Sequence, residues 1–362
     1  MLMSLITYTI IRKFKWGDEY LFIIASMLVT LGVAMLIRIN YTIGITQIIW
    51  YALGIVTFVI SFLVFRYINF WKNLQWFFYT LAIALFVLTL LFGTEAYGAK
   101  RWIHIGNFSM QPLELAKILY ALFLGAYFSK QNKRTYFGVQ ERFWVAGAVY
   151  VFCVLLVLQR EWGTTILSFS TFIILMFIYG AHWKMLIVNL IGLVAVAYYA
   201  AFNVSHVTIR VANWIDPFVD YSGRGFQTVQ SLIAMANGGF FGTGIGLGSP
   251  HFVPARHTDF IFSVIVEELG ILGGSAVILL FFILVYRGFK IALAARGFEK
   301  CVATIITVMF GLQTFIILGG VVNLIPLTGI TLPFVSYGGS SLITTFISFG
   351  ILQAISADAA SG

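Results

Sequence analysis

Residues 20–37 of the chain read YLFIIASMLVTLGVAMLI, an apolar run without a charged side chain. At 1.5 Å per residue, a helix of this length is about 27 Å long, close to the hydrocarbon thickness of a bilayer. Comparable runs recur along the chain, at residues 45–65, 74–92, 112–128, 142–158, 163–180, 184–202, 260–286, 301–322 and 341–356. The sequence therefore predicts an all-α integral membrane protein with about ten transmembrane helices.

The composition supports this prediction. Of the 362 residues, 60% are hydrophobic and 10% are charged, whereas soluble domains carry roughly 25% charged residues. The mean hydropathy is +0.97. The length would suggest two soluble domains, but that expectation does not apply to a chain whose solvent is the bilayer. We therefore expect residues 1–362 to form one polytopic membrane domain.

The formal net charge of +9 has a topological explanation. If the N-terminus is cytoplasmic, the predicted inner loops hold twice as many lysines and arginines as the outer loops. Cytoplasmic loops collect basic residues, so both termini are expected inside, and no nucleic-acid partner is expected. The short apolar stretch before Arg12, Lys13 and Lys15 is typical of an interfacial helix rather than of a secretory signal.

Three segments on the predicted outer side are unusual. Residues 203–259, between the seventh and eighth spans, are too long and too polar for a simple connection, and long loops often carry function. Residues 93–111 form a second long loop. Residues 323–340 contain Pro326 and Pro333, which indicates a broken helix or a re-entrant segment.

Glu114 and Lys117 lie inside the fourth predicted span. They are three residues apart, which places them on one helix face. Ionisable groups within a bilayer are costly and suggest function. Two interpretations remain open at this point. The pair neutralises itself and holds the bundle together, or it lines a polar cavity that opens toward the outer surface.

Asp259 lies at the outer mouth of the eighth span, directly after His257 and Thr258. Spacing alone favours a helix N-cap, because Thr and Asp prefer that position. The alternative is a general base, because partial desolvation at a membrane boundary raises the pKa of a carboxyl group toward a useful range. Glu267 and Glu268 follow in the same helix, where we expect them to pair with basic groups.

Arg210, Arg224 and Arg256 share the long outer loop with Asp259. They either contact lipid headgroups or bind a phosphate group, whose oxygens a guanidinium contacts bidentately. The run GGFFGTGIGLG at residues 238–248 has no following Lys-Ser/Thr and no strand–helix context, which excludes a P-loop. Close packing or a flexible gate explains these glycines better. The sequence also lacks the motifs of zinc metalloproteases and α/β-hydrolases.

Several motifs together resemble one family. In chain order they are RW at 101–102, QPLELAK at 111–117, RVANWIDP at 210–217, GFQTVQS at 225–231, GG at 238–239, HTDFIF at 257–262, EELG at 267–270 and LPFVSYGGSS at 332–341. This ordered set covers most of the chain and is similar to that of the SEDS family, which contains RodA, FtsW and SpoVE, with a RodA-like member expected.

The resemblance implies a peptidoglycan glycosyltransferase that polymerises lipid II at the outer face of the bacterial cytoplasmic (inner) membrane, in cell shape, elongation or division. It also implies a class B penicillin-binding protein as partner. The family's essential aspartate matches Asp259, and its intramembrane Glu and Lys match Glu114 and Lys117. The residues expected to bind substrate are Arg210, Arg101, Glu114, Lys117, Gln227, Gln230, Ser231, Arg224, Arg256, His257, Thr258 and Ser336.

Two positions depart from the family pattern. Gln-Pro-Asp-Leu-Gly-Thr is common before the sixth span, where this chain has Gln-Arg-Glu-Trp-Gly-Thr at 159–164. The acid is kept as Glu161, but the turn differs. A basic residue commonly precedes the glutamine matched by Gln47, where this chain has Thr46. The activity is still expected, whereas the choice among elongation, division and sporulation is weakened.

The expected mechanism uses one base. Asp259 would take the proton from the 4-hydroxyl of lipid II, which would attack the anomeric carbon of a glycan linked to undecaprenyl pyrophosphate and invert it. The leaving group needs positive charge, from Arg210 first, from Arg101, Arg224 or Arg256, or from a divalent cation such as Mg²⁺ or Mn²⁺. No organic cofactor is expected. The alternative functions are a lipid II flippase and a non-catalytic scaffold for the penicillin-binding protein.

Overall fold

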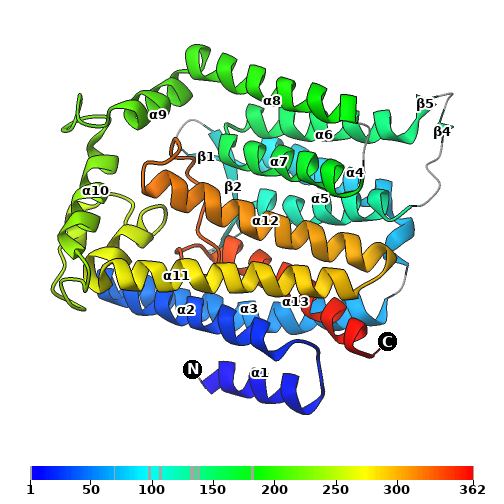
Figure 1. Cartoon of the computed structure of the whole chain (residues 1–362), viewed down its shortest axis with the longest axis horizontal. Coiled ribbons are helices and arrows are strands. Elements are labelled where there is room, and N and C mark those ends of the chain that lie inside the picture. The colour runs from blue at the N-terminus through cyan, green and yellow to red at the C-terminus, as the bar shows by residue number, and fades with distance from the viewer. Residues whose placement is uncertain are drawn as a thin grey trace.

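The computed structural model describes residues 2–68, 70–96, 99–105, 108–130, 135–136, 139–180 and 183–361. These residues form 13 α-helices, two short 3-10 helices and five short strands. Most of the long helices run side by side in one bundle, and the shorter elements lie at its two ends (Figure 1). The mostly helical architecture predicted from the sequence is therefore confirmed.

One helix lies at each of the ten predicted ranges. These helices are α2 (Glu19–Ile39), α3 (Tyr41–Tyr67), α4 (Gln75–Phe92), α5 (Pro112–Phe128), α6 (Glu141–Leu158), α7 (Trp162–Ile178), α8 (Trp183–Asn203), α11 (Ile261–Ala294), α12 (Gly297–Val321) and α13 (Gly339–Ser361). By length and composition, eight of them can cross a membrane. The other two, α5 and α7, have 17 residues each.

The centre of the bundle is formed by α12 and α13. Within an apolar stretch of 18 residues, 78% of the residues are buried in each of these two helices. In α8, which lies at the edge, only 11% are buried. Aromatic side chains fill the space between α3 and α13, where Phe58, Phe346 and Phe349 have no exposed surface. Phe334 packs edge-on against Phe349, with 5.3 Å between the ring centroids. The non-helical segment that contains Phe334 is therefore anchored in the core.

The segment between α4 and α5 is not helical. Its strands β1 (Thr94–Ala96), β2 (Ala99–Ile105) and β3 (Phe108–Met110) form an antiparallel sheet in that order. Strands β4 (Thr135–Tyr136) and β5 (Val139–Gln140) form a hairpin at the other end of the bundle. A wholly α-helical chain was predicted, and these strands correct it. Backbone groups outside the helices need partners, which strand pairing supplies.

The predicted loop at 203–259 contains three helical segments, α9 (Ser205–Ile215), α10 (Phe226–Gly238) and the short η2 (Pro250–Phe252). Helices α9 and α10 lie at the same end of the bundle as β1 and β2, on the left of Figure 1. The other short helix, η1 (Trp71–Asn73), precedes α4. We call the end of the bundle that carries α9 and α10 the Asp259 end.

Helix α1 (Leu2–Lys13) runs antiparallel to α2 along the side of the bundle (Figure 1). The Ser4 and Tyr51 hydroxyls are 2.8 Å apart, and the Tyr8 hydroxyl donates to Glu19 Oε2. The sequence predicted an interfacial helix here, and the structure places it against the side of the bundle. The physical reason is that Thr7 and Ile11 are buried against the bundle.

Two ion pairs join the two ends of α2 to α11. Arg287 Nη2 lies 3.2 Å from Asp18 Oδ1, and Arg38 Nε lies 3.3 Å from Glu268 Oε1. Arg38 follows Asp18 by 20 residues, which is about 30 Å of helix. That distance equals the hydrocarbon thickness of a bilayer, about 30 Å. The two pairs therefore lie at levels that match the two boundaries of a membrane.

Candidate functional site at the Asp259 end

Asp259 does not cap a helix. Helix α11 begins at Ile261, its N-cap residue is Phe260, and no side chain caps it. The capping interpretation is therefore wrong. Burial raises the pKa of the Asp259 carboxyl group above its usual value, while the positive charge of Arg210 and a hydrogen bond from Thr258 lower it. The site holds a carboxylate that is more basic than one in water and has a cation nearby.

Asp259 and Arg210 both lie beside Gly329. A Cβ atom at Gly329 would lie 3.6 Å from Asp259 Oδ2 and 3.2 Å from Arg210 Nη2, and the backbone φ there is +75°. Arg210 Nη1 donates to the Thr328 carbonyl at 2.7 Å. The guanidinium of α9 and the carboxylate before α11 therefore meet against the same stretch of backbone, between α12 and α13.

That stretch, residues 324–338, also fixes the residues before Asp259. Ser336 Oγ donates to the Thr258 carbonyl at 2.7 Å, and Tyr337 N donates to the His257 carbonyl at 2.8 Å. Gln47 Nε2 of α3 donates to the Ser336 carbonyl at 3.2 Å. In this structure Ser336 holds the chain that carries Asp259, and its hydroxyl is occupied by backbone contacts.

A group of basic residues surrounds Arg210. Burial lowers the pKa of His206, and the charges of Arg210, Arg160 and Arg101 lower it further. His206 Nε2 is buried without a hydrogen-bond partner. Sequence reasoning did not select His206 or Arg160 for this site. The spacing of His206 and Arg210, four residues apart on one helix, is the signal that could have found the histidine.

Arg101 of β2 is held by the turn between α6 and α7. Its Nε lies 3.2 Å from Glu161 Oε1, and its Nη2 donates to the Arg160 carbonyl at 2.9 Å. Gln111 donates to the same Glu161 oxygen at 3.2 Å. Burial raises the pKa of Glu161, and Arg101 lowers it. Arg101 thus fixes the position of Glu161 and of the turn between α6 and α7 at the edge of the site.

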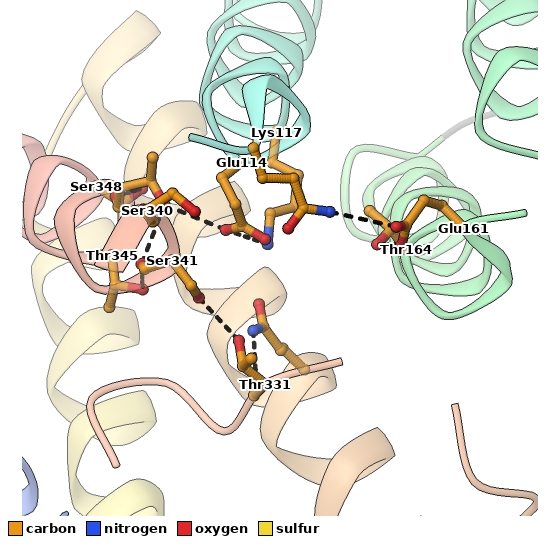
Figure 2. A network of polar contacts seen from close by, with 12 residues as sticks. Glu114, Lys117, Glu161, Thr164, Thr331, Ser340, Ser341, Thr345 and Ser348 are labelled. Atoms are coloured by element: carbon orange, nitrogen blue, oxygen red, sulfur yellow. Dashed lines mark hydrogen bonds and ion pairs between the residues drawn. The ribbon is translucent and has the colours of Figure 1, made fainter. Parts of the chain in front are cut away.

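Glu114 and Lys117 form the ion pair that their spacing predicted. Lys117 Nζ lies 2.9 Å from Glu114 Oε2, and each residue is 9% exposed. Thr344 of α13 donates to the same oxygen at 3.2 Å. Figure 2 shows hydroxyl side chains of α13 continuing the network toward Thr331. The pair lines a cavity of about 40 Å³, which has room for a water molecule or two.

The structure does not bring every predicted site residue together. Ser231 and Ser263 are fully buried with their hydroxyls 2.6 Å apart, so Ser231 joins α10 to α11. Arg256 Nη1 donates to the His251 carbonyl at 3.1 Å. The Arg224 carbonyl accepts from Asn213 at 2.7 Å. Gln227 is exposed and Gln230 is half-buried, both on α10.

The chain matches a family model over residues 18–361, that of the FtsW, RodA and SpoVE proteins, described as cell cycle proteins. It belongs to this family. Among its relatives is the peptidoglycan glycosyltransferase RodA of Mycobacterium tuberculosis strain H37Rv, 34% identical over 96% of this chain and 79% of that protein. Stage V sporulation protein E of Bacillus subtilis strain 168 is 33% identical over 94% of this chain and 96% of that protein.

Solved structures of the FtsW/RodA/SpoVE family share this fold. A chain from a peptidoglycan synthase complex, described as coordinating polymerization and crosslinking, has a TM-score of 0.78 and 27% identity over 96% of this chain and 99% of that chain. The crystal structure of the rod shape determining protein RodA of Thermus thermophilus has a TM-score of 0.70 and 27% identity over 94% of this chain and 97% of that chain.

One departure from the family pattern has a structural counterpart. Arg160 occupies the position of the common proline, and its φ is 58°. Proline is restricted to a φ near −65°, so the turn in this family member has a backbone that proline cannot adopt. The turn ends α6, and the Arg160 amide donates to the Val157 carbonyl at 2.9 Å.

Proposed function

We propose that this chain is a peptidoglycan glycosyltransferase that polymerises lipid II into glycan strands, with Asp259 as the general base. The observation that carries the proposal is the position of Asp259, half-buried at the start of α11 and next to Arg210. A hydroxyl group of a lipid-linked sugar would arrive at this level, because its pyrophosphate is held at the membrane surface.

The proposed topology has ten spans, with both termini in the cytoplasm and the Asp259 end outside the bacterial cytoplasmic membrane. The bias of basic residues supports this orientation. In it, residues 203–259 form a large extracellular segment between the seventh and eighth spans. Helices α9 and α10 of that segment lie at the Asp259 end, so Arg210 would be extracellular as well.

The proposed reaction is one inverting displacement. The proton of the acceptor's 4-hydroxyl passes to the Asp259 carboxylate while the hydroxyl oxygen bonds to the donor's anomeric carbon. The bond from that carbon to the pyrophosphate breaks, and undecaprenyl pyrophosphate leaves with the electron pair. The α-linked donor becomes a β-1,4 linkage. A raised pKa makes Asp259 a better proton acceptor, and Arg210 favours its ionised form.

The departing pyrophosphate requires positive charge. Arg210 is the first candidate, because its guanidinium carries several donors and one of them is already fixed on Thr328. Arg160 adds positive charge to the same region, whereas the lowered pKa of His206 favours its neutral form. In this proposal Arg101 acts mainly through Glu161, and Arg224 and Arg256 lie on the approach to the site.

A divalent cation fits this site only as a partner of the substrate. The described part of the chain contains no group of three or more His, Cys, Asp and Glu side chains that could hold a metal ion. Mg²⁺ usually keeps several waters and binds through one or two carboxylates plus substrate phosphates. Asp259 is the carboxylate present at the site. When bound, the ion would neutralise charge on the pyrophosphate.

The proposed partner is a class B penicillin-binding protein, and the proposed role is in cell shape, elongation or division. The solved relative from a peptidoglycan synthase complex supports such a partnership. The polar network around Glu114 is the observation that favours the alternative, a lipid II flippase. Its cavity of about 40 Å³ is far smaller than a lipid headgroup, which favours the polymerase.

The test is a polymerisation assay. The purified chain, with and without a class B penicillin-binding protein, is given labelled lipid II and Mg²⁺ or Mn²⁺, and glycan strands are separated on gels. Asp259→Asn should abolish strand formation. Asp216→Asn is the matched control, because the Asp216 carboxylate contacts an exposed loop amide.

Strand formation by Asp259→Asn at the wild-type rate would refute the assignment of the base. Vesicles that contain the wild-type chain and its partner provide the second measurement. Transfer of labelled lipid II between their leaflets without any strand formation would favour the flippase instead.

A further inference from the structure

The glycine-rich loop between α10 and η2 exposes large apolar side chains. The exposed fractions are 57% for Phe240, 79% for Phe241, 72% for Ile245 and 76% for Leu247. These four residues fall within eight consecutive positions. Contiguous apolar surface of this kind marks contact with a protein, a ligand or a membrane.

The backbone of the same loop turns inward, toward a break in α11. Gly270 has φ 72° and ψ −174°, which interrupts the helix. In an unbroken helix, the Ile271 amide would donate to the Glu267 carbonyl. Here it donates to the Gly239 carbonyl at 2.9 Å, and the Glu267 carbonyl accepts from the Thr243 amide at 2.9 Å. The loop therefore replaces the hydrogen bonds that the break removes.

Side chains satisfy further polar groups of the loop. Glu267 Oε1 accepts from the Ser249 amide at 3.0 Å, and Glu268 Oε2 accepts from the Gly246 amide at 3.1 Å. Arg38 Nη2 of α2 donates to the Gly246 carbonyl at 2.8 Å. Both glutamates are buried, with 3% and 1% exposure. Two carboxylates and one guanidinium thus form hydrogen bonds with the backbone of a single loop.

The glycines allow this close approach. A Cβ atom at Gly242 would lie 2.2 Å from the Glu268 carbonyl oxygen, and one at Gly248 would lie 2.9 Å from Glu268 Cγ. A side chain at either position would push the loop away from α11. The glycine run predicted to serve close packing or a gate therefore packs against the broken turn.

The depth of the loop follows from the two ion pairs between α2 and α11. The Arg38–Glu268 pair lies about 30 Å along the helix from the Asp18–Arg287 pair, at the level that matches the membrane boundary. Ile271 and Leu272 of α11 are about half exposed. They continue the apolar surface of the loop into the lipid-facing side of the bundle.

We infer that residues 240–247 form a lipid-embedded loop at the Asp259 end, with its four apolar side chains among the lipids of that leaflet. Irregular backbone is tolerated at membrane depth only where its polar groups are satisfied by the protein. Glu267, Glu268 and Arg38 supply those partners. This function explains why two carboxylates are buried beside an exposed apolar loop. The inference goes beyond the proposed enzymatic activity and does not depend on it.

Spin labels at single cysteines test the inference. The chain has two cysteines, both buried, so Cys153→Ala/Cys301→Ala gives the background. Labels are placed by Phe241→Cys and Leu247→Cys, and the protein is reconstituted in vesicles of phosphatidylethanolamine and phosphatidylglycerol. Collision rates with oxygen, which partitions into lipid, and with a nickel chelate, which stays in water, are then measured. Leu279→Cys on the exposed face of α11 is the lipid control, and Ser222→Cys is the water control.

The expected result is that both loop labels resemble the Leu279→Cys label. Oxygen collisions should exceed those of the Ser222→Cys label, and nickel collisions should be several-fold lower. Nickel collisions equal to those of the Ser222→Cys label would overturn the inference. Exclusion of both probes would also overturn it, because a protein surface would then cover the loop.

A second variant tests the role of the buried carboxylate. Glu268→Gln, combined with Leu247→Cys, removes the charge that pairs with Arg38, so nickel collisions should rise several-fold as the loop loosens. Glu19→Gln is the matched control, because it breaks the Arg12–Glu19 pair at the other end of α2. Equal collision rates in the two variants would refute the role of Glu268. Polymerisation is not measured, so failure here is distinct from failure of the proposed function.

Discussion

Arg210 and Asp259 approach the same glycine, Gly329. Each has an atom within 4 Å of the point where a side chain on Gly329 would begin. The carboxylate, the guanidinium and the glycine come from three segments far apart in the chain. In the proposed reaction the acceptor hydroxyl must reach the carboxylate and the pyrophosphate must reach the guanidinium, so we expect the space beside Gly329 to be needed.

That space is tested by Gly329→Ala. A methyl group there would lie within 4 Å of both charged groups, and alanine at φ +75° is strained. We expect strand formation to fall about tenfold or more, because displacements of about 1 Å at a reaction site are costly. Gly180→Ala is the matched control, because φ is +67° there and no atom of the described residues lies within 4 Å of the added carbon.

Both variants should lose about 1–2 kcal/mol of stability from the left-handed backbone. Thermal unfolding in detergent measures that loss, and the polymerisation assay measures activity. Equal activity of the two variants would show that the space beside Gly329 is not used.

The pH dependence of polymerisation should report Asp259. A general base must be deprotonated, so the rate should fall at low pH, below the raised pKa of Asp259. Arg210 lowers that pKa, so Arg210→Gln should move the acid limb of the kcat/KM profile to higher pH. Arg224→Gln changes a guanidinium that is not among the causes of the shift, and its acid limb should stay in place. A shift to lower pH in Arg210→Gln would contradict the proposed coupling.

The buried ion pair should behave as a unit. Glu114→Gln leaves Lys117 unpaired and Lys117→Met leaves Glu114 unpaired, so each single change should cost about 3–5 kcal/mol. The double variant should lose less stability than the sum of the two single changes, because it contains no unpaired buried charge. Unfolding in detergent provides the measurement.

Arg12→Gln is the control for the ion pair, because the Arg12–Glu19 contact is exposed at 4.0 Å and should contribute less than about 1 kcal/mol. Additive losses in the double variant would show that Glu114 and Lys117 act separately.

The turn at Arg160 gives a prediction specific to this chain. Glycine readily adopts its φ of 58°, whereas the proline ring does not allow this angle. Arg160→Gly should therefore retain the unfolding temperature, and Arg160→Pro should lower it, although proline is common at this position in the family. The two unfolding temperatures are compared in the same detergent. If Arg160→Pro is as stable as Arg160→Gly, the turn has the backbone of the family pattern.

The positions of the long helices could be predicted from the sequence, because they depend on local runs of apolar residues. Each predicted range, such as 112–128 and 142–158, coincides with a helix to within a few residues at most ends. A long apolar run can satisfy its backbone in a bilayer only as a helix or in a closed barrel. The strands β1–β3 and the placement of α1 were not predicted, because they depend on contacts with other segments.

The candidate site was predictable in its parts and not in its arrangement. Motif resemblance selected Asp259, Arg210 and the Glu114–Lys117 pair. It gave no indication that the first two both lie beside Gly329, or that Ser336 holds the backbone of Thr258. His206 was missed because its only local signal is its spacing of four residues from Arg210, and that spacing alone does not show that both side chains face the site.

The sequence by itself determined a polytopic helical membrane protein and its family, and it selected Asp259 as the proposed base. These properties depend on hydrophobic runs and on motifs, which are local and ordered along the chain. Only the tertiary structure decided that Asp259 is a half-buried carboxylate rather than a helix cap. The physical reason is that its burial and its electrostatics come from Arg210 and from residues 324–338, and folding alone brings these segments to the start of α11.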